Sequence, residues 1–414
     1  MKISSIKFDK FIISVLLLFV GVILEPLIRD NNYFSIFVWG GFLLLNTDIW
    51  NSILNKRFLK LNMFLISFAL IILISCFAVQ SVIKDYIEFR GEGTTMGRAI
   101  FKSITLVSSI LFIENVVIHK KGKKFLKMFL FFLFFYVFII DIDALLFVSN
   151  SEISKRDYDL LYIAGNKFDL TYTNMYLFFI YCKYYIIRNT LKKRYCYLLL
   201  LLCLFVSVYS KCSTSIIACL FLFCFFFFKF GKMRIVYSPV FYIIVSITCT
   251  FALLVFSTII LQMEAVKSIL HMLGESEDLT SRLIIWERIV VLFDQRPLLG
   301  FGIGNVGGVV GNLSNAFDTQ NGVLDLYIQF GVIGVVLYFS MLIHFLMKSK
   351  HNTSSVPFVA YLYMILLISM VEIPLTLSTL IIASFSIIPN RKYYIIINNE
   401  KFTYHRRRAI WLSY

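Results

Sequence analysis

Long apolar runs, separated by short polar segments, recur along the whole chain. Most of these runs are long enough for a helix to cross the hydrocarbon core of a bilayer, which takes about 20 residues. They predict spans at residues 8–28, 33–51, 62–82, 99–118, 125–148, 170–187, 195–210, 213–230, 239–262, 323–347, 356–372 and 374–390. The pattern therefore predicts an all-α integral membrane protein of about twelve transmembrane helices.

The composition excludes a soluble fold. Hydrophobic residues make up 59% of the 414 residues and charged residues only 15%. In a typical soluble domain, about a quarter of all residues are charged. The eight cysteines lie in or beside apolar runs, with no second cysteine or histidine at metal-ligand spacing. We therefore expect them to be small apolar side chains, with no disulfide and no metal site.

The net charge of +16 fits either nucleic-acid binding or membrane orientation. With the N-terminus inside, most of the 40 basic residues fall in cytoplasmic segments, for example HKKGKKFLK at 119–127 and RNTLKKR at 188–194. Cytoplasmic loops of membrane proteins are enriched in Lys and Arg in this way. The basic excess is thus explained by orientation and by anionic membrane lipids, without nucleic acid, and both termini are expected in the cytoplasm.

One segment between spans, residues 263–322, is far longer than the others and falls on the outer side. Long loops are usually functional or disordered, and a helix-like stretch with one proline and a group of glycines favours an ordered structure here. The predicted organisation is spans one to nine at 1–262, this extracytoplasmic segment at 263–322, spans ten to twelve at 323–390, and a basic cytoplasmic tail at 391–414.

Apolar residues recur at helical spacing in the first part of this outer segment. They are Leu279, Leu283, Trp286, Val290 and Phe293. This spacing predicts an amphipathic helix that lies on the outer membrane surface or packs against the bundle. We expect Asp278 or Thr280 to cap its start and Pro297 to end it.

Three arginines, Arg282, Arg288 and Arg296, lie along or just after this predicted helix. In one interpretation they extend toward the interface or pair with Glu287 and Asp294. In the other, one or more of them binds an anionic group, because the planar guanidinium suits phosphate oxygens.

Gly302, Gly304 and Gly307 spell a GxGxxG pattern. A dinucleotide site is excluded because no strand precedes the pattern and because the segment is expected outside the cell. Tight turns or close backbone approach are the expected use of these glycines. The chain also has no P-loop and no kinase motif, so we expect no cofactor and no direct use of ATP or nucleotide sugars.

The tenth predicted span opens with Asn321, Asp325 and Gln329, which share one helix face because they are four residues apart. Ionisable groups in a span usually face a cavity or a partner. Hydrogen bonding to other helices is the alternative interpretation.

Smaller polar features lie on the same predicted side. They are Arg98 and Lys102 at the fourth span, Lys211 at the turn after the seventh, and Asp141 and Asp143 at the end of the fifth. Each alone is typical of an interfacial anchor, but together they make the outer face the chemically interesting one.

These motifs resemble a known family. Arg282 and Trp286 followed by PLLGFGIGN, and then an N-x-x-L-D helix start with FGVIG, resemble the bacterial O-antigen and capsule polysaccharide polymerase (Wzy) family and the related O-antigen ligases. The stretches YIAGNKFDLTYTNMY and YSKCSTSIIACLFL are also similar to capsule polymerases. The resemblance covers roughly residues 158–345, and the order and sidedness of the motifs are more specific than any single motif.

The resemblance implies a glycosyltransferase of the bacterial cytoplasmic membrane that acts at the outer leaflet. It would transfer a growing glycan from undecaprenyl pyrophosphate to a lipid-linked repeat unit, with a chain-length regulator as a further partner. Arg282 would then contact the pyrophosphate or the glycan. The other candidate substrate-binding residues are Arg288, Arg296, Trp286, Asn321, Gln320, Lys211 and Arg98.

Two positions depart from the family pattern. O-antigen ligases carry a histidine before the asparagine of the tenth span, where this chain has Gln320, and the hairpin that often carries a Ser-Arg pair has only Lys211. A histidine base is thus not available at that site, so we expect an acid to accept the proton of the attacking sugar hydroxyl. Asp325 is favoured over Asp318 as this catalytic residue, and Glu287 is a third option.

Other functions stay open beside the polymerase. They are an O-antigen-type ligase, a flippase or transporter of lipid-linked oligosaccharide, and a sensor or permease. Flippases often show two related halves around a cation-lined cavity. The two halves of this chain do not resemble each other, and only one of its outer segments is long. A polymerase in which arginines stabilise the leaving pyrophosphate without any base also stays open.

Overall fold

The computed structural model describes residues 9–25, 32–53, 55, 58–79, 96–146, 162–260, 264, 280–314, 319–350 and 352–389. Its α-helices are α1 (Lys10–Ile23), α3 (Asn32–Leu45), α4 (Leu59–Val79), α6 (Met96–Ile118), α7 (Gly122–Leu146), α9 (Lys167–Ile187), α10 (Lys193–Tyr209), α11 (Ser213–Phe227), α12 (Pro239–Ile260), α14 (Thr280–Gln295), α15 (Val306–Ser314), α16 (Gly322–Ser349), α17 (Val356–Ile368) and α18 (Leu377–Ser384). Short 3-10 helices are η1 (Thr47–Ser52), η2 (Phe230–Lys232), η3 (Arg234–Tyr237), η4 (Thr353–Ser355) and η5 (Phe385–Ile387). Across these residues the chain forms no strand, and a single bridge joins Tyr162 to Gly165.

A helix lies within or across every predicted span, and the all-helical prediction is confirmed. Within the described residues, α4, α6, α7 and α16 are long and apolar enough to cross a membrane, and shorter apolar helices accompany them. The chain is therefore a multi-pass membrane protein, while the number of twelve spans stays a prediction. The last predicted span is the least regular, because α18 has only eight residues and follows an irregular segment at 369–376 that contains Pro374.

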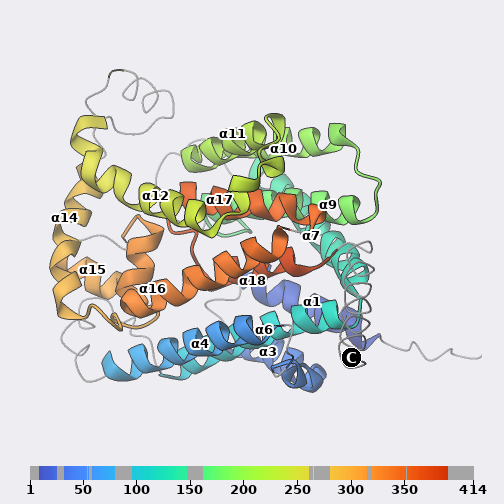
Figure 1. The fold of residues 1–414 in the computed structure, drawn as a ribbon, viewed down its shortest axis with the longest axis horizontal. Helices are drawn as coiled ribbons and strands as arrows, with labels where there is room; N and C mark the ends of the chain where they lie inside the picture. The colour runs from blue at the N-terminus through green and yellow to red at the C-terminus, as the bar shows by residue number, and fades with distance from the viewer. Residues whose placement is uncertain are drawn as a thin grey trace, which may run out of the picture.

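The membrane helices lie side by side in one bundle (Figure 1), with α4 between α6 and α16, and α9 between α7 and α10. Aromatic edges pack between these helices: the Phe68 ring lies 5.3 Å from Phe330 and 5.9 Å from Tyr338. The outward face of α7 carries Phe134 and Phe138, which are both 58% exposed. Such a surface suits contact with acyl chains, which fits a bundle held in lipid.

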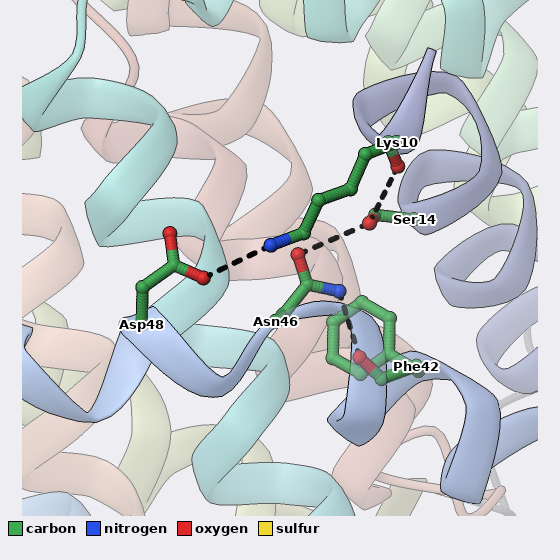
Figure 2. A network of polar contacts seen from close by, with 5 residues as sticks. All are labelled: Lys10, Ser14, Phe42, Asn46 and Asp48. Carbon is green, nitrogen blue, oxygen red and sulfur yellow. Dashed lines mark hydrogen bonds and ion pairs between the residues drawn. The ribbon is translucent and has the colours of Figure 1, made fainter. Parts of the chain in front are cut away.

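Side chains join α1 to the turn between α3 and η1 (Figure 2). The Ser14 hydroxyl donates to Asn46 Oδ1 at 3.0 Å, and Asn46 Nδ2 donates to the carbonyl of Phe42 at 2.7 Å. Lys10 Nζ lies 3.4 Å from Asp48 Oδ1 at the exposed edge of the same network. Because Ser14 and Asn46 are buried, their mutual bond offsets the cost of placing two polar groups in the core.

At one end of the bundle, α14 and α15 lie beside the first part of α16 (Figure 1). These elements share a second hydrophobic core that is separate from the main one. Its buried members are Ile285, Trp286, Ile289, Leu292, Phe301, Val306, Val309, Val310, Leu324 and Ile328. We call α14, residues 296–305, α15 and residues 322–330 the α14–α16 module.

The amphipathic helix predicted in the long segment is present as α14, and it ends before Pro297 as expected. Of the predicted apolar face, Trp286 is buried and Phe293 is partly buried, while Leu279 lies outside the described residues. The buried face also includes Ile285, Ile289 and Leu292. These residues share the second core with residues of α15 and α16, while the side chains of Leu283 and Val290 lie outside the described part.

Candidate functional site

Helix α16 is broken at Gly331, whose φ of 63° and ψ of −171° are essentially restricted to glycine. The break separates residues 322–330 from residues 332–349, which lie in the main bundle. In the first half, Leu324 and Ile328 belong to the core of the α14–α16 module, whereas Leu326 and Phe330 belong to the main core. Backbone groups on both sides of such a break lose their partners within the helix.

Residues 297–302, which we call the splice segment, supply the missing donors. The N–H of Phe301 donates to the carbonyl of Ile328 at 2.7 Å, and the N–H of Gly302 donates to the carbonyl of Gln329 at 2.8 Å. These two bonds satisfy the carbonyl groups at the end of the first half of α16.

The same segment also supplies the missing acceptors. The N–H of Val332 donates to the carbonyl of Pro297 at 2.9 Å, and the N–H of Ile333 donates to the carbonyl of Leu298 at 3.4 Å. An unpaired backbone group in a bilayer costs several kcal/mol. The splice segment therefore makes the break in α16 a stable part of the fold.

Glycines permit this close contact between two backbones. A Cβ atom on Gly300, which has a φ of 65°, would lie 2.5 Å from the Ile328 carbonyl oxygen, and one on Gly331 would lie 2.3 Å from Leu298. Gly302 and Gly304 also have positive φ angles, of 83° and 79°. The expected tight turns at the GxGxxG pattern are thus present at these two positions, and Gly302 also lies close to the backbone of Cys76.

Asp325 lies in the first half of α16 and is only 5% exposed. Gln329 Nε2 donates to Asp325 Oδ2 at 2.6 Å. The backbone carbonyl of Gln329 accepts the bond from Gly302 in the splice segment. Gln329 therefore connects the Asp325 carboxylate to the splice segment through two separate groups.

Asn321, the first residue of the predicted polar face, is the N-cap of α16 and is fully buried. Its Oδ1 accepts from the N–H groups of Val323 and Leu324, both at 3.1 Å, and its Nδ2 donates to the carbonyl of Met370 at 3.3 Å. The structure thus joins Asp325 to Gln329 and uses Asn321 to begin the helix, a role that contributes about 1 kcal/mol.

Trp286 brings α14 to the start of α16. Its indole Nε1 donates to the carbonyl of Thr319 at 2.9 Å. Gln320 follows with a φ of 48° and leads directly into Asn321. The structure therefore brings Trp286, Gln320, Asn321 and Asp325 into one region at the start of α16.

The three arginines differ in what the structure describes. Arg296 Nη1 donates to the carbonyl of Ala78 at the end of α4, at 3.0 Å. This contact holds the start of the splice segment against the carboxyl end of a helix, where a cation is stabilising. Arg288 lies exposed on α14. Arg282 is within α14 but its side chain lies outside the described part, as does the whole of Asp318.

Lys211 and Arg98 lie on other elements of the fold, outside the α14–α16 module. Lys211 is exposed in the turn between α10 and α11 with a φ of 52°, and Arg98 is exposed in the first turn of α6. One turn along α6, Lys102 pairs with Glu25, whose other carboxylate oxygen accepts from the Ser378 hydroxyl at 2.7 Å. Neither Lys211 nor Arg98 is part of the core of the α14–α16 module.

Asp141 and Asp143 have local partners. Asp141 Oδ1 accepts from Asn174 Nδ2 at 2.8 Å, which joins α7 to α9. Asp143 Oδ2 accepts from the N–H of Ile163 at 2.8 Å. Both acids therefore connect elements of the fold.

Sequence reasoning missed a group of residues between α9, α17 and α18. Glu372 is almost fully buried, and its carbonyl oxygen lies beside Gly322 at the start of α16. Tyr172, Tyr176 and Tyr361 line a recess close by in the fold. The signal for Glu372 was present, because VEIP places an acid inside an apolar run.

Within the described residues, no three His, Cys, Asp or Glu side chains are grouped so that they can hold a metal ion. Residues 198–339 match the family model described as O-antigen ligase (Wzy_C). This range contains α14, the splice segment, α15 and the break in α16. Comparisons with curated proteins and with solved structures found no match. The family match confirms the resemblance to the O-antigen polymerase and ligase families and supports a membrane enzyme of polysaccharide or O-antigen assembly.

Proposed function

We propose that this membrane enzyme of polysaccharide assembly is a polymerase of lipid-linked repeat units. Its donor is a growing glycan on undecaprenyl pyrophosphate, and its acceptor is a repeat unit on the same kind of carrier, for capsule or O-antigen synthesis. The donor carries its own activation, so the reaction needs no nucleotide and no cofactor.

One observation carries the proposal: the buried carboxylate of Asp325 lies within the family-matched range, on a half-helix that a glycine-rich segment holds in place. Burial of an acid in a membrane protein is costly and typical of a functional group. Its hydrogen bond from Gln329 gives the carboxylate a defined orientation.

In the proposed step, a sugar hydroxyl of the repeat unit attacks the anomeric carbon of the growing glycan. A new glycosidic bond forms while the bond from that carbon to the pyrophosphate oxygen breaks, and the leaving oxygen keeps the electron pair. The hydroxyl proton passes to Asp325 as general base. Asp318, which lies outside the described residues, is the alternative acceptor for this proton.

The leaving pyrophosphate requires cations near the membrane surface. We assign Arg282 and Arg288 on α14 to this role, with Lys211 and Arg98 as charges on other elements of the fold. Arg296 is already engaged with Ala78 and holds the splice segment. The indole of Trp286 is likewise engaged with Thr319, and the amide of Asn321 caps α16 and donates to Met370, so both shape the site.

The proposal includes the orientation expected from the basic residues. Both termini face the cytoplasm, and the α14–α16 module faces outward in the cytoplasmic membrane. The division at 1–262, 263–322, 323–390 and 391–414 follows from this orientation, and a chain-length regulator is a further partner. Cysteine labelling from outside tests it in a variant whose eight natural cysteines are replaced, with a new cysteine at exposed Arg288.

An O-antigen-type ligase is the second candidate, because the matching family model carries that description. A ligase transfers the same kind of donor glycan to a different acceptor. Gln320 stands where the resembled ligases carry a histidine, and this difference favours the polymerase.

The decisive experiment uses the purified full chain in proteoliposomes with purified lipid-linked repeat units. We expect a ladder of longer glycans from the parental protein. Asp325→Asn should lower the rate by about 100- to 10,000-fold, since this is the usual contribution of a general base. Asp141→Asn is the matched control, because Asp141 also accepts a bond from a side-chain amide but lies outside the module.

Three results would contradict the proposal in different ways. A parental rate from Asp325→Asn would show that Asp325 is structural. Transfer only to an added acceptor that is not a repeat unit would indicate the ligase. Movement of repeat units across the bilayer without any new glycosidic bond would indicate the flippase.

A further inference from the structure

The splice segment takes the place of two hydrogen bonds that an unbroken α16 would form. In a regular α-helix, Val332 would donate to Ile328 and Ile333 would donate to Gln329. Here both carbonyls accept from residues 301–302, and both N–H groups donate to residues 297–298. The inserted segment thus bonds to the end of the first half of α16 and to the start of the second half, while Leu326 and Phe330 of the first half also pack in the main core.

We propose that the splice segment and Gln329 position the Asp325 carboxylate for reaction. This inference rests on the proposed function, in which Asp325 accepts a proton. Gln329 is the positioning residue: its carbonyl is held by Gly302, and its side-chain amide holds Asp325. A shift of the splice segment can therefore reach the carboxylate through Gln329.

The splice segment also contacts the main bundle, through α4. Arg296, just before it, donates to Ala78 in the last turn of α4. Gly302 lies so close to α4 that a Cβ atom would be 3.2 Å from the Cα of Cys76. A chain of contacts thus runs from α4 through Gly302 and Gln329 to Asp325, and displacements of about 1 Å along such a chain can cost about 100-fold in rate.

Three variants separate the backbone contacts from the side-chain contact. Gly331→Ala forces strain and overlap at the break, and Gly302→Ala does so more mildly on the α4 side. Gln329→Ala keeps the backbone bonds and removes only the amide that holds Asp325. Gly40→Ala in α3 is the matched control, because a Cβ atom there meets nothing within 4 Å.

Two readouts are measured on the full chain. Amide hydrogen exchange, read by mass spectrometry over residues 299–303 and 331–335, reports the splice itself. We expect exchange to rise in both stretches together in Gly331→Ala and Gly302→Ala, and to stay parental in Gln329→Ala and Gly40→Ala. A rise in only one stretch would overturn the reciprocal splice.

Polymerisation kinetics report how Gln329 positions the Asp325 carboxylate. We expect Gln329→Ala to lower kcat by roughly 10- to 100-fold with KM changed less than about twofold, because an orienting contact acts on the reacting geometry. In the double variant with Asp325→Asn, the Gln329→Ala change should cause no further loss. An added loss, or a parental kcat in Gln329→Ala, would overturn the positioning role.

The two proposals fail in distinguishable ways. A parental protein that makes no polymer refutes the proposed function, whereas the exchange data still decide on the splice. If Gly331→Ala does not accumulate in membranes, Gly302→Ala and Gln329→Ala decide the test by the same readouts.

Discussion

The two ends of the bundle hold their helices together in different ways. Around α1 and η1 the joints are side chains: Ser14 bonds to Asn46, and Lys10 pairs with Asp48 (Figure 2). In the α14–α16 module the joint is backbone to backbone, through the splice segment and the break at Gly331.

This difference determines which substitutions each end tolerates. A side-chain joint loses one hydrogen bond when one residue changes, and the helices around it keep their own backbone bonds. A backbone joint needs two main chains in contact, so a Cβ atom at Gly300 or Gly331, where the two backbones meet, should disturb several of the four bonds together. The module should therefore be the more sensitive end, although its hydrophobic core is the smaller one.

The largest expected effect comes from Gly300→Ala. The new Cβ atom would meet the Ile328 carbonyl oxygen at 2.5 Å, at a φ of 65°. We expect the module to be destabilised by about 3 kcal/mol from strain and overlap together. Thermal unfolding of the detergent-purified protein measures this, with Gly41→Ala in α3 as the control because its nearest contact is an ordinary 3.5 Å. Equal melting temperatures for the two variants would remove the claimed difference between the ends.

Trp286→Phe should have the next largest effect. It keeps most of the buried aromatic surface but leaves the Thr319 carbonyl without its 2.9 Å bond. An unsatisfied buried acceptor costs about 1–3 kcal/mol. The melting temperature should fall clearly below that of Trp50→Phe, a control in η1 whose indole is 39% exposed. If Trp50→Phe lowers the melting temperature as much, the hydrogen bond from Trp286 to Thr319 does not contribute the expected stability.

Asn46→Ala tests the side-chain joint at the other end. It removes one bond to Ser14 and one to Phe42, both in buried surroundings. We expect a loss of about 1–2 kcal/mol with parental polymerisation kinetics, because α16 is not displaced. Stability is read from the same unfolding assay. A fall in kcat comparable to that of Gln329→Ala would contradict the separation of the two ends.

Asp48→Asn should have the smallest effect. The side chains of Lys10 and Asp48 are 56% and 61% exposed, and exposed ion pairs contribute about 0.2–1 kcal/mol, less at high salt. The difference in melting temperature from the parental protein should vanish in 1 M salt, where the Debye length is about 3 Å. A loss that persists at high salt would show that Asp48 stabilises η1 by other means.

Much of the site was predictable because the relevant signals are local. The period of apolar residues predicted α14, and Pro297 predicted its end. The spacing of Asp325 and Gln329 predicted their common face, which the structure shows as a 2.6 Å hydrogen bond. Asn321 and Gln329, which lie four residues to either side of Asp325, both bond to it because helical geometry relates such neighbours directly.

Other features were not predictable because they depend on long-range contacts. Gly331 fits a straight helix as well as a broken one, and only its meeting with Leu298 distinguishes the two. The sequence left open whether Arg296 pairs with an acid, extends toward the interface or binds an anion, yet in the structure it donates to Ala78, more than two hundred positions away in the chain. The VEIP motif marks Glu372 as an acid in an apolar run, but its place beside Gly322 at the start of α16 depends on the tertiary structure.

The sequence by itself determined the helical membrane class, the helix positions and the composition of the polar face. These follow from hydropathy, helical period and the need to satisfy backbone groups inside a bilayer, which are properties of neighbouring residues. The tertiary structure alone decided that α16 breaks at Gly331 and that residues 297–302 complete its hydrogen bonds. The physical reason is that a broken helix in a membrane is stable only when another backbone bonds to its free N–H and C=O groups. The sequence of the helix does not specify which backbone segment that will be.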